Sequence, residues 1–265
     1  MNGTYRQLER RWKQLRRIDG LRVHEVACVN APRTLLCVEF GDPRGPAIAI
    51  AAGIHGDEPA GPWALLDLVE SGGLDPAFSY RVWPCTNPTG YDAGTRAAAD
   101  GSDLNRTFGR GGRSPEARAI LTANRDRKFV LSLDLHEDCD ARGFYCYEYG
   151  GGEVGRHAIA ALDAAGLPVD PLEATFATAG PLDESSATRE RGRIVADHFA
   201  EAAVLGELSY SLAVARRAAR HALTFESPSQ ASWESRLATH VTAVRAAVGA
   251  VSAAGAKVTG ATMLE

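Results

Sequence analysis

The sequence predicts an α/β protein, a single domain of three layers with helices on both faces of a central mixed, mostly parallel sheet. Two observations support this prediction. Short apolar segments alternate with longer segments of helical periodicity along the chain. The chain has 265 residues, of which 45% are hydrophobic, enough for a large core without disulfides. Because we find no internal repeat and no linker, we expect residues 1–265 to form one domain.

The elements follow in order. Residues 1–20 begin with a basic amphipathic helix, because Leu8, Trp12 and Leu15 fall on one helical face. Its basic face suits a membrane or a partner, but we favour a solvated helix packed on the domain through Trp12. Strands are predicted over Arg22–Val29, Thr34–Phe40, Ala47–Ala52, Tyr80–Cys85, Phe129–Leu135, Phe144–Tyr149 and His221–Phe225. Helices are predicted over Pro59–Glu70, Ser114–Arg127, Gly155–Ala165 and Trp233–Ala254.

Three details complete this outline. Asp57 is a candidate N-cap for the helix that begins near Pro59. Residues 87–113 are rich in Gly, Asn, Asp, Thr and Pro, and we expect mostly loop there. Residues 167–200 have no regular pattern, so we expect a surface excursion or a lid over a pocket.

Composition and charge exclude several classes of function. The chain carries 29 basic and 33 acidic residues, and it has no basic stripe of the kind that nucleic acids require. The longest apolar stretch, 47–54, is too short to span a bilayer. Five cysteines without a CxxC pair indicate reduced thiols. We therefore expect a cytoplasmic protein that binds neither nucleic acid nor membrane.

A metal site is predicted where two strands end. His55 and Glu58 follow an apolar strand directly, and His136 follows the apolar segment 131–135. Ligands in open α/β sheets bind beyond the carboxyl ends of the strands. Two histidines and a glutamate, with a fourth position open for water, form a set that suits catalytic zinc. Each piece alone has a plainer explanation, since HxxE pairs are common surface features and histidines at strand ends are usually structural.

Further motifs follow in a specific order. They are Asn87-Pro88-Thr89-Gly90-Tyr91, Arg96, Asp103-Leu104-Asn105-Arg106 and, near the end, Phe225-Glu226-Ser227-Pro228. Together with the His and Glu residues above, the series resembles the zinc metallocarboxypeptidases over about residues 47–230. The motifs are also similar to the branch that contains the succinylglutamate desuccinylases and aspartoacylases. NPTGY looks more like the peptidases, whereas HGDEPAG and DLNRTF also look like the acylase branch.

The resemblance implies a role for each matching residue. His55, Glu58 and His136 would bind Zn²⁺, and Asp103 would orient His55 by accepting its ring N–H. Arg96 would stabilise the oxyanion and Glu226 would be the general base. Asn105 and Arg106 would hold the substrate carboxylate, which the planar guanidinium fork matches well. The plainer alternatives are loop salt bridges for the two arginines, with Asp92, Asp100 or Asp103, and a helix cap or surface carboxylate for Glu226.

The function implied is zinc-dependent cleavage of an amide bond next to a free carboxylate, in a small molecule or short peptide. The alternatives are an N-acyl amino acid hydrolase of the desuccinylase/aspartoacylase type and a catalytically silent zinc-binding module. The chain ends soon after the helix that follows Glu226, without the extra C-terminal β-domain of many desuccinylases, which favours a compact peptidase-like enzyme.

Two features of the predicted site stay open. The peptidases close a mobile tyrosine on the substrate, and the candidates here are Tyr145, Tyr147, Tyr149 and Tyr210. The acidic residues after His136, namely Glu137, Asp138 and Asp140, suit a solvated turn or a second metal ion.

Overall fold

The computed structural model describes residues 3–149, 152–171, 188–196 and 208–261, and, for residues 110, 196 and 253–261, only the backbone. Within these ranges one nine-stranded sheet has the order β1-β2-β4-β3-β5-β9-β6-β8-β7. The strands are β1 (Arg22–Val26), β2 (Leu35–Gly41), β3 (Ala47–Ala52), β4 (Ser79–Trp83), β5 (Phe129–Asp138), β6 (Tyr145–Tyr149), β7 (Thr188–Glu190), β8 (Arg193–Ala196) and β9 (Ala219–Pro228).

The centre of the sheet is parallel and its flanks are mixed. Strands β4, β3, β5 and β9 run parallel to one another. On one side β2 and β1 are added antiparallel, and on the other β6 pairs antiparallel with β9 and parallel with β8, while β7 closes the edge antiparallel. The carboxyl ends of the central strands therefore meet at one edge of the sheet, where the predicted site residues lie.

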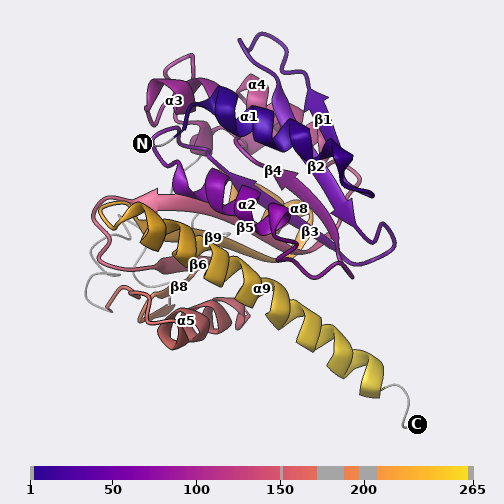
Figure 1. The fold of residues 1–265 in the computed structure, drawn as a ribbon, viewed down its shortest axis with the longest axis vertical. Coiled ribbons are helices and arrows are strands. Elements are labelled where there is room, and N and C mark those ends of the chain that lie inside the picture. The colour runs from indigo at the N-terminus through magenta and orange to yellow at the C-terminus, as the bar shows by residue number, and fades with distance from the viewer. Residues whose placement is uncertain (1–2, 150–151, 172–187, 197–207, 262–265) are drawn as a thin grey trace.

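Helices cover both faces, which confirms the predicted three-layer α/β architecture (Figure 1). The helices are α1 (Tyr5–Gln14), α2 (Ala60–Glu70), α3 (Pro88–Ala93), α4 (Pro115–Ala123), α5 (Val154–Ala164), α8 (Tyr210–Arg217) and α9 (Trp233–Ala261). One core lies beneath α1, α2, α5 and α9, and a second lies beneath α4 and α8.

Strand β3 shows how the sequence specifies this arrangement. All of its side chains are apolar and nearly all are buried. Ile48 and Ile50 pack into the first core, whereas Ala49 and Ala51 pack into the second. A strand buried on both faces is typical of a parallel sheet covered by helices on both sides.

The N-terminal helix packs on the domain as predicted. Leu8 and Trp12 are fully buried, and Leu15 follows them in the short 3₁₀ turn after α1. Thr4 and Gln7 form a reciprocal capping box at the start of the helix. Among the described residues, no helix is both long enough and apolar enough to cross a membrane.

Three predictions need correction. Asp57 does not cap α2, since the N-cap is Pro59 and the first amide of the helix, that of Ala60, donates to the Glu137 carboxylate instead. Strand β5 continues to Asp138, so His136 lies within the strand rather than after it. The loop predicted over 87–113 contains α3, which begins at the Asn87 cap and ends at left-handed Gly94.

Residues 167–200 are only in part a surface excursion. Strands β7 and β8 extend the sheet here, and β8 pairs with β6. The sequence pattern did not predict β8, because this strand begins with Arg193, an arginine that is buried through its ion pair with Glu148. The predicted lid would fall mainly on 172–187 and 197–200, which lie outside the described residues.

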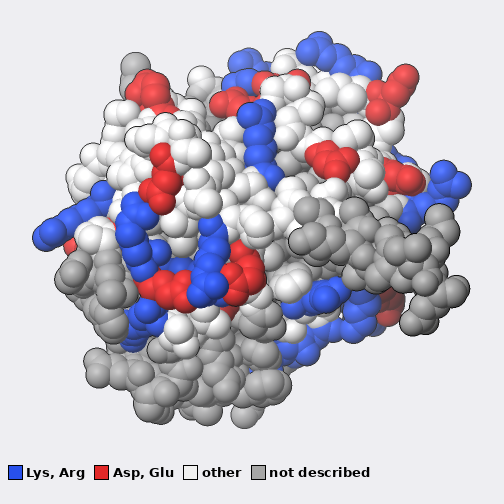
Figure 2. All heavy atoms as spheres, turned by 90° about the horizontal axis from the view of Figure 1, so that it is seen from below, with Lys and Arg blue, Asp and Glu red and all other residues white. Residues whose placement is uncertain are grey.

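On the face shown in Figure 2, basic and acidic side chains are interspersed. All five cysteines are free; Cys139 is exposed and the other four are buried. The described fold therefore contains no disulfide among its cysteines.

Candidate active site

The loop after β3 carries the first two candidate metal ligands. It begins at Gly53, which adopts a left-handed conformation with φ of 63° and accepts a hydrogen bond from the Asn87 amide at 2.9 Å. A Cβ atom on Gly56 would stand 1.9 Å from the carbonyl carbon of Gly90, so glycine is required where this loop crosses α3. The NPTG motif thus fixes the loop that holds His55 and Glu58.

The same motif also fixes the segment that carries Arg96. The Asn87 side chain caps α3 by accepting from the Gly90 amide at 2.9 Å. Its Nδ2 donates to the carbonyl oxygens of Arg96 and Ala97, at 3.3 and 3.2 Å. Asn87 therefore connects the two loops of the site, a structural role for a motif that sequence reasoning had recognised only by resemblance.

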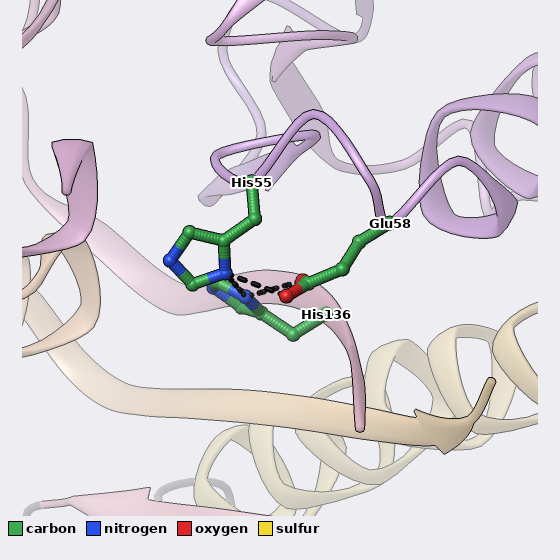
Figure 3. A group of neighbouring side chains, drawn as sticks. All are labelled: His55, Glu58 and His136. Carbon is green, nitrogen blue, oxygen red and sulfur yellow. Dashed lines mark hydrogen bonds and ion pairs between the residues drawn. The ribbon is translucent and has the colours of Figure 1, made fainter. Parts of the chain in front are cut away.

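His55, Glu58 and His136 converge on one point (Figure 3). His55 Nδ1 lies 2.6 Å from Glu58 Oε1, and His136 Nδ1 lies 2.8 Å from Glu58 Oε2. The two Nδ1 atoms are 3.2 Å apart. All three side chains are buried, and one donor atom from each lies within 4.8 Å of the others, so the three can hold a metal ion.

A carboxylate holds the second nitrogen of each imidazole. His55 Nε2 lies 3.2 Å from Asp103 Oδ1, and His136 Nε2 lies 3.0 Å from Asp134 Oδ2. A proton on each Nε2 leaves the Nδ1 lone pairs free for a cation, which is the usual arrangement at zinc sites. Sequence reasoning missed Asp134, although an aspartate two residues before His136 in an apolar strand must share its face of the sheet.

The charges of the site favour a cation. Although burial alone would raise it, contact with His136 and His55 lowers the pKa of Glu58 to about 2. Burial also opposes ionisation of Asp103, but the hydrogen bond from His55 and the charge of Arg96 hold its pKa well below the usual range. Both carboxylates are therefore ionised at neutral pH, and the residues present fit a divalent metal.

Arg96 lies at the open side of this group. Its Nε and Nη2 donate to Asp103 Oδ2 at 3.2 and 3.0 Å, so the predicted alternative of a loop salt bridge exists in the fold. Its Nη1 also lies 3.2 Å from His55 Nδ1 and 3.6 Å from Glu58 Oε1. The salt bridge to Asp103 thus places a half-exposed guanidinium directly beside the candidate metal ligands.

Asn105 and Arg106 lie further along the same loop. Asn105 is buried, and its Oδ1 accepts from the Tyr210 amide at 3.0 Å, which anchors the first turn of α8. Arg106 donates from Nη1 to the Asn105 carbonyl oxygen at 3.1 Å and is half-buried. Asn105 and Arg106, the two residues predicted to bind the substrate carboxylate, therefore also make hydrogen bonds that stabilise the fold.

Glu226 lies beside His136 on the neighbouring strand. The register of β5 and β9 pairs His136 with Glu226, and that of β9 and β6 pairs Glu226 with Tyr145. Residues opposite each other in a sheet share a face, so Glu226 lies on the face of the metal ligands. Burial, reinforced by the charges of Glu58 and Asp138 and opposed by His136, raises the pKa of Glu226 well above its usual value. Because Glu226 lies within β9, well before α9, it is not a helix cap.

The candidate tyrosines are mostly fixed in the fold. Tyr145 is buried and donates to Asp138 Oδ2 at 2.7 Å. Tyr149 and Tyr210 are also buried, and Tyr210 packs against Phe108 in the second core. Tyr147 is partly exposed and packs edge-on against Tyr145.

The acidic residues after His136 separate into two groups. The solvated turn expected there is wrong for Glu137, which is buried against Arg236 and the start of α2. Asp138, Cys139 and Asp140 are more exposed and bring their donor atoms within 4.8 Å of one another.

The fold and the metal-ligand group define a metallocarboxypeptidase-like hydrolase. Residues 44–248 match the succinylglutamate desuccinylase/aspartoacylase catalytic domain, and the chain belongs to this family. The fold is similar to that of a candidate metallopeptidase from Shewanella amazonensis, with a TM-score of 0.71 and 24% identity over 92% of this chain and 91% of that one.

Two further proteins are similar to this chain over part or most of its length. A metallo-carboxypeptidase from Pseudomonas aeruginosa, in complex with (2-guanidinoethylmercapto)succinic acid, shares the fold with a TM-score of 0.61 and 16% identity over 94% of this chain and 68% of its own. Carboxypeptidase SOL1 from Arabidopsis thaliana is 32% identical over a 127-residue alignment, and the match covers 38% of this chain and 26% of that protein. The chain thus matches only about a quarter of the length of this curated relative.

Proposed function

We propose that this protein is a zinc-dependent hydrolase that cleaves an amide bond next to a free carboxylate, with His55, Glu58 and His136 as zinc ligands. The observation that carries this proposal is the convergence of two imidazole Nδ1 atoms and one carboxylate, with each imidazole held from behind by a second carboxylate. We further propose that residues 1–265 act as one cytoplasmic domain that binds neither nucleic acid nor membrane.

The side chains around the ligands divide the chemistry among them. Zinc, when bound, lowers the pKa of water and polarises a carbonyl group. Glu226, beside His136, takes a proton from the attacking water and returns it to the leaving nitrogen. Burial raises the pKa of Glu226, which favours the protonated form that gives its proton to the leaving nitrogen. Arg96 donates to the oxyanion from the open side of the site.

The substrate in this proposal is a small molecule or short peptide whose carboxylate binds Arg106 and the side-chain amide nitrogen of Asn105. Support comes from the carboxypeptidase relatives and from the Pseudomonas aeruginosa neighbour, whose bound molecule is a succinic acid derivative. The second candidate is an N-acyl amino acid hydrolase, which the family match itself favours.

Metal content and hydrolysis, measured together, test the proposal. Purified protein is assayed for zinc and for cleavage of a panel of dipeptides and N-acyl amino acids, beside His136→Ala. We expect about one zinc per chain in the wild type, as in catalytic sites with three protein ligands. We expect both the zinc and the activity to be lost in His136→Ala.

The products decide between the two candidates. Release of a free C-terminal amino acid from peptides supports the peptidase, and release of succinate, acetate or another acyl acid supports the acylase. Zinc binding without turnover of any compound would favour a silent zinc-binding module. A wild type that takes up no zinc on reconstitution would refute the ligand assignment itself.

A further inference from the structure

An ion pair with a buried carboxylate lies directly behind the candidate metal ligands, outside the set of residues assigned above. The Glu137 side chain is fully buried. Its Oε1 accepts from the Ala60 amide at 2.7 Å, and its Oε2 is ion-paired with Arg236 Nε. Arg236 comes from the start of α9, which follows the strand that carries Glu226.

Glu137 is bound to Glu58 by two routes. Its main-chain N–H donates to Glu58 Oε2 at 3.1 Å, which orients the carboxylate itself. Its side chain holds the Ala60 amide, only two residues beyond Glu58, and so fixes the backbone from which that carboxylate projects. Glu137 also adjoins His136 in β5. Glu137 thus connects two of the candidate ligands, Glu58 and His136, and links them through Arg236 to α9.

We infer that Glu137, paired with Arg236, is a positioning residue that holds Glu58 and His136 at metal-binding distance. This inference rests on the proposed zinc site. The Glu137 carboxylate cannot contact a bound substrate, because it is fully buried and its oxygens bind the Ala60 amide and Arg236. Its effect therefore passes through the ligands, and it should appear in the affinity for zinc before it appears in the chemical step.

A second ion pair in the same sheet provides a matched control. Glu148 is also fully buried, accepts from the Val154 and Gly155 amides at the start of α5, and pairs with Arg193 Nε at 2.7 Å. Both carboxylates thus project from a strand, accept from the first amides of a helix and pair with an arginine, which is buried in the case of Arg193 and partly buried in the case of Arg236. Glu148, however, lies in β6 and touches none of the candidate ligands.

The experiment compares Glu137→Gln with Glu148→Gln in the full-length chain. Glutamine keeps an oxygen for the helix amide and removes the charge that pairs with arginine. The zinc dissociation constant is measured by competition with a chelator, and the melting temperature of the metal-free protein by calorimetry. We expect both variants to melt earlier, and we expect zinc affinity to fall by about 10- to 100-fold in Glu137→Gln only.

Each outcome has a separate meaning. A wild type without zinc defeats the proposed function, whatever the variants do. If the wild type binds zinc and Glu137→Gln binds it as tightly as Glu148→Gln does, the inference is wrong while the zinc site stands. Should Glu137→Gln fail to fold, Arg236→Lys replaces it, since lysine keeps the charge but not the planar fork. Its zinc affinity should fall at least about threefold, and an unchanged value would overturn the inference.

Discussion

The candidate site has two halves that are built differently. His55, Glu58, Arg96 and Asp103 come from loops between 53 and 107, which are held by side-chain hydrogen bonds and close glycine contacts. His136, Glu226 and Tyr145 come from three neighbouring strands and are aligned by the register of the sheet. Substitutions in the strand half should therefore change chemistry with little change in shape, whereas those in the loop half should act by moving backbone.

The two histidines show the same contrast. Asp134, which holds His136, is completely buried. Asp103, which holds His55, is partly exposed and also binds Arg96 and the Asn105 amide. Within the described residues the Asp134 carboxylate thus hydrogen-bonds to His136 alone, whereas the Asp103 carboxylate also connects two parts of the loop.

The largest effect on turnover is expected at Glu226, in the strand half. Glu226→Gln removes the proposed general base and keeps the side-chain volume, so kcat should fall by about 10²- to 10⁴-fold. Zinc content should stay at the wild-type level, because Glu226 is not among the converging donors. Steady-state kinetics on the best substrate of the panel, beside metal analysis, provides the measurement. A variant that keeps its full kcat would exclude Glu226 as the base.

Next in size is the difference between the two supporting aspartates. Asp134→Asn should weaken zinc binding by about 10- to 100-fold, as expected for a carboxylate that supports a metal-bound histidine. Asp103→Asn should weaken zinc binding less and should instead raise KM, because it also releases Arg96. Chelator competition and substrate kinetics on both variants separate the two effects. Equal zinc affinities would show that the two halves hold their histidines equally firmly.

A third, smaller effect concerns the loop half alone. A Cβ atom at Gly90 would lie 2.4 Å from Asn87 Nδ2 and 2.7 Å from the Ala97 carbonyl oxygen. Gly90→Ala should therefore displace the segment that carries Arg96 and cost about 1–3 kcal/mol of stability, as overpacking does. We expect kcat/KM to fall roughly tenfold, equivalent to about 1.4 kcal/mol. Chemical denaturation measures the stability and steady-state kinetics measures kcat/KM. Wild-type values of both would show that the backbone accommodates the added methyl group without strain.

The two halves also differ in how well the sequence predicts them. The loop residues are predictable because the chemistry and the tight backbone require particular residue types at short spacing, as in His55 to Glu58 and Asn87 to Gly90. The partner of Glu137 was not predictable, since Arg236 lies 99 residues away. The central strands were predictable from their apolar runs, whereas β8 was not, because its first residue, Arg193, is an arginine buried by a non-local charge pair.

The smallest effect is expected at Tyr145, next to Glu226 in the strand half. Its hydroxyl donates to Asp138 at 2.7 Å and its side chain is 3% exposed, so it is not poised to close on a substrate. Tyr145→Phe removes one partly buried hydrogen bond and should cost about 1 kcal/mol of stability. Since that bond does not reach Glu226, kcat/KM should change by less than about threefold, within roughly 0.7 kcal/mol. A much larger fall in kcat with KM unchanged would instead place the Tyr145 hydroxyl in the transition state and make this buried residue the counterpart of the tyrosine that the resemblance to the peptidases implies.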